Sequence, residues 1–77
     1  MDQTDFQLLP PEEQIAEAIK VVRKVASRTG FLYGPISLIQ RNFLLGFGQA
    51  KDIVEELIRR EILFEKQERI AYFLPRY

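Results

Sequence analysis

The chain contains no cysteine and no histidine. It therefore has no disulfide bond, no thiol nucleophile and no imidazole base, and the side chains of ordinary zinc sites are missing. A chain of 77 residues also forms a core too small to enclose a catalytic cleft of ordinary size. We therefore expect a protein that is not an enzyme and has no catalytic residues, metal, cofactor or small-molecule substrate.

The sequence also lacks any apolar run that approaches the roughly 18–20 residues of a membrane-spanning helix. Its first residues, Met1-Asp2-Gln3-Thr4-Asp5, are acidic, which is the wrong charge for a signal peptide. The absence of cysteine is compatible with a reducing compartment. These features predict a cytoplasmic location and no membrane partner.

Nearly half of the residues are apolar, which is typical of one folded domain. The charges balance over the whole chain but are unevenly distributed. Residues 1–17 carry five acidic residues and no basic one, whereas residues 18–77 carry all 11 basic residues against six acidic ones, a net charge of +5. Such a basic body favours a polyanionic partner. Many neutral domains show a similar imbalance by chance, so an ordinary charged surface is the alternative.

Residues 12–29 have the pattern of an amphipathic helix. Pro10-Pro11 suits the first turn of this helix, and Gly30 suits its C-terminal end. Residues 1–11 are predicted to form an N-terminal arm, short and extended. The apolar stripe predicted for the helix consists of Ile15, Ala18, Ile19, Val22, Val25 and Ala26.

Phe31-Leu32-Tyr33-Gly34-Pro35 is predicted to form a brief strand or an extended link into a second helix. Ser37 and Gln40, three residues apart, have the spacing of a capping box, in which each side chain satisfies a free backbone N–H at a helix start. The helix that they begin is predicted to continue to Leu44.

A tight turn, a third helix and a hairpin are predicted to follow. Gly46 and Gly48 permit the backbone angles of a tight reversal, and the apolar spacing after them predicts a helix over residues 48–61. Two β-forming stretches then flank a polar turn. These are Ile62-Leu63-Phe64 and Ile70-Ala71-Tyr72-Phe73-Leu74, on either side of Lys66-Gln67-Glu68, with Pro75 ending the hairpin.

The order helix, strand, helix, helix, hairpin is typical of a winged helix-turn-helix. We therefore predict an α+β fold, mainly α, in which residues 12–77 form one winged-helix domain of three helices and a C-terminal β-hairpin wing. A helix-turn-helix presents its second helix to a groove of DNA. The hairpin would cover the apolar side of the third helix, which three helices alone leave open.

The segment around the predicted turn also carries a family resemblance. The positions that carry it are Ile36, Ser37, Gln40, Arg41, Phe43, Leu45, Gly46, Phe47 and Ala50. At these positions the chain resembles the C-terminal gamma domain of the FtsK/SpoIIIE DNA translocases. The resemblance implies a winged helix that binds short oriented DNA sequences. That family usually has an asparagine and arginines where this chain has Gly48, Gln49 and Asp52.

The candidate DNA-binding residues lie on the two helices of the turn and on the hairpin: Ser37, Arg41, Gly48, Gln49, Lys51, Lys66 and Arg69. Gln49 and Lys51 begin the third helix, where side chains first reach base edges in this fold. Glutamine can pair with adenine, and lysine can reach guanine or a phosphate. The alternative is that both are ordinary solvent-exposed helix residues.

The other cations each have two interpretations. Arg41 either contacts a phosphate or pairs with a carboxylate such as that of Asp52. Lys66 and Arg69 either enter a minor groove and follow the phosphates, or keep an exposed sheet edge from aggregating. A basic strip on the first helix is either a phosphate-binding surface or an ordinary solvated face. The strip consists of Lys20, Arg23, Lys24 and Arg28.

Two classes of function follow from these features. The first is a small DNA-binding protein, such as a transcription regulator, with its third helix in the major groove of double-stranded DNA. The second is a winged helix that contacts proteins, for example as a homodimer. Tyr33, Tyr72 and Tyr77 can stack on bases, although aromatic residues beside strands more often belong to the core or its rim.

Overall fold

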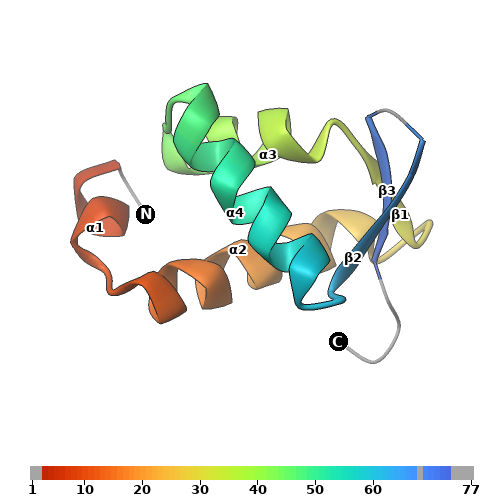
Figure 1. Cartoon of the computed structure of the whole chain (residues 1–77), viewed down its shortest axis with the longest axis horizontal. Coiled ribbons are helices and arrows are strands. Elements are labelled where there is room, and N and C mark those ends of the chain that lie inside the picture. Colours follow the sequence, from red (N-terminus) through yellow and green to blue (C-terminus); the bar gives the residue numbers. More distant parts are fainter. Residues whose placement is uncertain (1–2, 68, 74–77) are drawn as a thin grey trace.

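The computed structural model describes residues 3–67 and 69–73. Its fold is α+β and mainly helical, as predicted, with a small antiparallel sheet. α1 and the sheet lie at opposite ends of the long axis, with the longer helices between them (Figure 1). The elements in chain order are α1 (Gln3–Leu8), α2 (Pro11–Ala26), β1 (Phe31–Tyr33), α3 (Pro35–Phe43), α4 (Phe47–Arg59), β2 (Leu63–Gln67) and β3 (Ile70–Phe73).

The described chain has four helices, one more than predicted, because residues 3–8 form α1. The extended conformation predicted for the N-terminal arm is therefore wrong. A six-residue helix is too short to show a periodic pattern in the sequence, and so short a helix is stabilised by packing. Phe6 supplies that packing, because its ring is fully buried and stacks on Phe43 with the ring centroids 4.2 Å apart. Gln14 Nε2 also donates to the carbonyl oxygens of Phe6 and Leu9.

The sheet has the strand order β1-β3-β2, and both pairings are antiparallel. This confirms the short strand and the hairpin. β2 extends through Lys66 to Gln67 and contains an irregularity between Glu65 and Gln67, so the turn is shorter than predicted. Arg69 in that turn has a left-handed backbone, with φ 68°. The predicted roles of Glu68, Leu74 and Pro75 fall outside the described residues.

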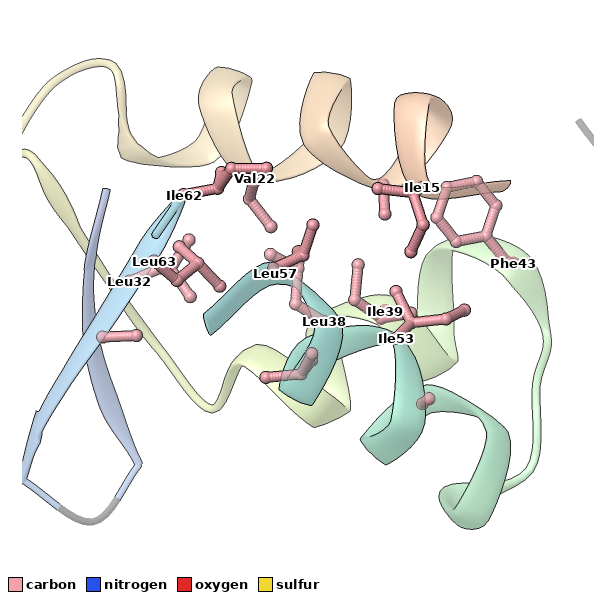
Figure 2. Close-up of a cluster of buried hydrophobic side chains, with 14 of the residues drawn as sticks. Ile15, Val22, Leu32, Leu38, Ile39, Phe43, Ile53, Leu57, Ile62 and Leu63 are labelled. Carbon is pink, nitrogen blue, oxygen red and sulfur yellow. The ribbon is translucent and has the colours of Figure 1, made fainter. Parts of the chain in front are cut away.

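The core lies between α2, α3, α4 and the inner face of the sheet (Figure 2). The apolar spacing predicted most of it, including the buried side of α4. Val25 is an exception, because its side chain is 46% exposed. α2 ends at Ala26, and Gly30, with φ 82°, donates its N–H to the Ala26 carbonyl at 2.7 Å. None of the helices among the described residues is long and apolar enough to cross a membrane.

α3 begins earlier than the capping box predicted, and that prediction is wrong. Pro35 occupies the first turn and Gly34 is the N-cap residue, with no side-chain cap hydrogen bond. Proline is favoured there because its fixed φ suits a helix and its missing N–H needs no partner. Gly34 has φ 55°, and its N–H donates to the Arg69 carbonyl at 2.6 Å. Ser37 therefore lies inside the first turn of α3, and its side chain is exposed.

The reversal between α3 and α4 does not use its glycines for left-handed backbone, which also corrects the sequence prediction. Leu44 takes that conformation, with φ 55°, while Gly46 is extended, with φ −70°, and Gly48 lies within α4. A left-handed leucine costs roughly 1–2 kcal/mol. The reversal at Leu44 turns Leu45 into the core, where it is 6% exposed, and this burial offsets the cost.

Candidate nucleic-acid interface

The first turns of α4 are exposed to solvent. Phe47 is 60% exposed, and Gly48 and Lys51 are also exposed. An added Cβ at Gly48 would meet no atom within 4 Å, so the backbone there lies open to a close approach. This end of α4 is therefore free to meet a ligand over most of its surface.

Gln49 is the exception on this surface, because α1 reaches it. Gln7 Nε2 donates to Gln49 Oε1 at 2.9 Å, and Gln49 Nε2 donates back to Gln7 Oε1 at 3.2 Å. The amide that the sequence assigned to adenine is thus already paired within the chain. The pair is exposed to solvent, so a ligand could displace it at little cost.

A hollow of about 690 Å³ lies between the start of α3, the hairpin and Phe47. It brings together three of the predicted site residues, Ser37, Arg41 and Arg69, although they are far apart in sequence. Glu65 on β2 is the one carboxylate among the described residues that line it. Lys51 and Gly48 do not line the hollow but follow Phe47 on the next turn of α4.

Arg41, Lys51 and Arg69 form no ion pair with any residue that the structure describes. The alternative in which Arg41 pairs with Asp52 is therefore not realised. Unpaired cations near one hollow raise the positive potential there, which attracts phosphate. Lys66 lies elsewhere, with Nζ 5.9 Å from the centroid of the Tyr72 ring.

The basic strip of α2 belongs to a second surface. Lys20, Lys24 and Arg28 line a hollow of about 530 Å³ beside Asn42 of α3, and this hollow shares no lining residue with the first. Lys20 Nζ pairs with Glu17 at 2.8 Å. Arg23 is exposed and lines neither hollow. The basic strip of α2 and the start of α4 therefore do not line the same hollow.

The C-terminal end of α4 carries a network of ion pairs. Arg60 donates to Glu12 on α2, at 2.6 Å and 3.0 Å, and to Glu56 at 2.5 Å. Arg59 also donates to Glu56. Hydrogen bonds from Arg59 and Arg60 lower the pKa of Glu56 from its ordinary 4.5 to about 2. A hydrogen bond from Arg60 lowers the pKa of Glu12 as well.

The structure exposes three aromatic residues of the sheet, two of which are tyrosines for which the sequence favoured the core or its rim. Tyr33, Phe64 and Tyr72 are 69%, 56% and 38% exposed. The alternation of side chains along each strand could have indicated this exposure, because it places Leu32 and Ala71 in the core and their neighbours on the outer face. The described residues contain no group of three or more side chains that could hold a metal ion.

Comparison with protein-family models, curated proteins and solved structures gives no match for this chain.

Proposed function

We propose that this protein is a winged-helix domain that binds double-stranded DNA, with the first turns of α4 in the major groove. The proposal is supported by the order of elements from α2 to β3 and by the strand order β1-β3-β2. In this arrangement α3 and α4 are the helix-turn-helix and the β2–β3 hairpin is the wing. α1 is an addition at the N-terminal side.

The observation that carries the proposal is the group of three cations, Arg41, Lys51 and Arg69, that form no ion pair with a described residue. Arg41 and Arg69 line one hollow, and Phe47 connects that hollow to the exposed start of α4. Phosphate contacts from such side chains supply most of the affinity of a protein for DNA.

The proposed contacts divide into two kinds. Arg41, Arg69 and the hydroxyl of Ser37 contact phosphates, which fixes the orientation of the domain on the duplex. Lys51 reaches a guanine or a phosphate within the groove, and Gly48 lets the backbone of α4 approach the DNA closely. Gln49 reads a base only after its amide leaves Gln7.

Contact with another protein, for example as a homodimer, is the second candidate function. Acidic residues on the outer side of α4 favour it, because they repel phosphate. Arg59 and Arg60 bind the carboxylate of Glu56, which leaves Asp52 and Glu55 as the exposed acidic residues of α4. Since Lys51 lies one turn before Glu55 on the same helix, it offsets part of this negative charge, and DNA binding remains the better proposal.

A salt titration of binding to a mixed-sequence duplex tests the proposal. Release of counterions by the three cations Arg41, Lys51 and Arg69, each on a phosphate, predicts that log K falls with log salt concentration with a slope of roughly −3. Fluorescence anisotropy with a labelled duplex measures this slope. Micromolar protein that leaves the duplex unbound at low salt contradicts the proposal. Sedimentation that detects a stable dimer in the same sample would then favour the second candidate.

A further inference from the structure

The outer face of the sheet carries a row of exposed aromatic rings. The register pairs Phe31 with Tyr72 and Tyr72 with Phe64, so these three side chains cross β1, β3 and β2 on one face. Tyr33 lies on the same face, two residues along β1 from Phe31. The opposite face packs on the core through Leu32 and Ala71.

The rings of Phe31, Tyr33 and Tyr72 lie in contact, and the register places Phe64 beside Tyr72 on the next strand. The ring centroids of Phe31 and Tyr33 are 5.3 Å apart with the planes at 83°, and those of Phe31 and Tyr72 are 6.0 Å apart with the planes at 53°. An exposed apolar patch of this kind marks an interaction site in most proteins. Rings that meet edge to face leave part of each π-face open to another flat group.

The charge on this face is positive. Lys66 lies over the Tyr72 ring at 5.9 Å. Glu65, the carboxylate nearest to it along β2, pairs in register with the buried Ala71 and so belongs to the opposite face. Glu65 is the one acidic residue of the described strands, and it meets the rings only at Tyr33, where both line the hollow of about 690 Å³.

We propose that this outer sheet face binds single-stranded nucleic acid by stacking unpaired bases on its aromatic rings. Every base offers a π-face to such a ring, and a neighbouring lysine neutralises the phosphate that follows the base. A second copy of this chain fits the face less well, because it would bring a second Lys66 toward the first.

This inference goes beyond the proposed function, because it concerns a different ligand and the outer face of the sheet, which borders the hollow of the proposed duplex site only at Tyr33. Duplex binding depends on Lys51 and Arg41, whereas single-strand binding depends on Phe64, which does not line that hollow. Each can therefore be lost while the other is retained.

The test measures the affinity of a fluorescein-labelled oligothymidine for the full chain at low salt, by anisotropy. Phe64→Leu and Tyr33→Leu keep an apolar side chain but remove the ring. Each is expected to weaken binding by about fivefold or more, since one stacked base contributes that much affinity. Leu8→Ala is the control, because Leu8 is 78% exposed and belongs to α1, at the opposite end of the molecule.

Three outcomes overturn the inference. The first is no binding of the oligothymidine by micromolar protein. The second is an equal loss of affinity in the Leu8→Ala control. The third is a dimer, detected by sedimentation, that dissociates in Phe64→Leu while the oligothymidine stays unbound, since the face is then occupied by a second copy. Ring-dependent binding of the oligothymidine by a protein that does not bind duplex, even without substitution, supports the inference and contradicts only the proposed function.

Discussion

At the C-terminal end of α4, Arg59 and Arg60 are both bound by carboxylates, and one of these belongs to α2. At the N-terminal end, Lys51 forms no ion pair with a described residue, and the neighbouring Phe47 is exposed. The arginines at the C-terminal end of α4 are therefore paired within the chain, whereas the lysine near its N-terminal end is not. The difference suggests that the first end holds the helix in place and that the second is kept for a ligand.

α1 complicates this comparison, because it supports the region around the exposed end. Phe6 stacks on Phe43, close to the turn that leads into α4, and Gln7 pairs with Gln49. The exposed end is thus held from beneath by buried aromatic rings, while its outer surface stays open.

The largest expected effect comes from removing that support. Phe6→Ala deletes a fully buried ring, and such changes cost about 3–5 kcal/mol of unfolding free energy. Urea denaturation followed by circular dichroism measures the loss. Leu8→Ala on the same short helix removes an exposed side chain and should change stability by less than about 0.5 kcal/mol. Equal effects of the two substitutions would show that α1 does not stabilise the domain.

The ion pairs at the other end of α4 predict a dependence of stability on pH. The folded-state pKa of Glu56, about 2, lies below its ordinary 4.5. Its contribution to stability is therefore complete above pH 4.5 and is lost as the pH falls toward 2. The melting temperature should fall over this range, and Glu56→Gln should flatten the fall while lowering the melting temperature most near neutral pH.

Glu55→Gln is the matched control for this prediction. It removes the adjacent carboxylate, which forms no ion pair with a described residue. Its acid profile should follow that of the unchanged protein. A profile for Glu56→Gln that is as steep as that of the unchanged protein would mean that the ion pairs do not anchor α4.

A smaller effect is expected from Gly48→Ala at the exposed end. Gly48 has helical backbone, and a Cβ there meets no atom within 4 Å. Alanine favours the helix by up to about 1 kcal/mol, so the melting temperature should rise by a few degrees. If DNA approaches the backbone closely at this point, the same methyl group should weaken duplex binding. A stabilised variant with unchanged duplex affinity would remove Gly48 from the interface.

The sequence predicted the elements that follow from local residue patterns. The spacing of Ile53, Val54 and Leu57 placed one side of α4 in the core, and two β-forming stretches around a polar turn identified the hairpin. Features that depend on contacts between distant residues could not be predicted in this way. α1 is stabilised by the stacking of Phe6 on Phe43, and Arg60 pairs with Glu12, 48 positions away.

Local signals also failed where two of them competed. Ser37 and Gln40 have the spacing of a capping box, but Pro35 is better suited to the first turn of α3 and starts the helix earlier. The candidate site was likewise predicted only in part. Ser37, Arg41 and Arg69 gather at one hollow, whereas the amide of Gln49 is paired with Gln7, a contact that no sequence pattern indicates.

The most direct test of the account compares Lys51→Glu with Arg23→Glu in duplex binding at low salt. The two substitutions make the same change in net charge, but Arg23 lies on α2 and lines neither hollow. We expect Lys51→Glu to weaken binding by about tenfold or more and to reduce the salt slope by about one, with little effect from Arg23→Glu. Equal losses of affinity in the two variants would contradict the claim that the exposed end of α4 meets DNA.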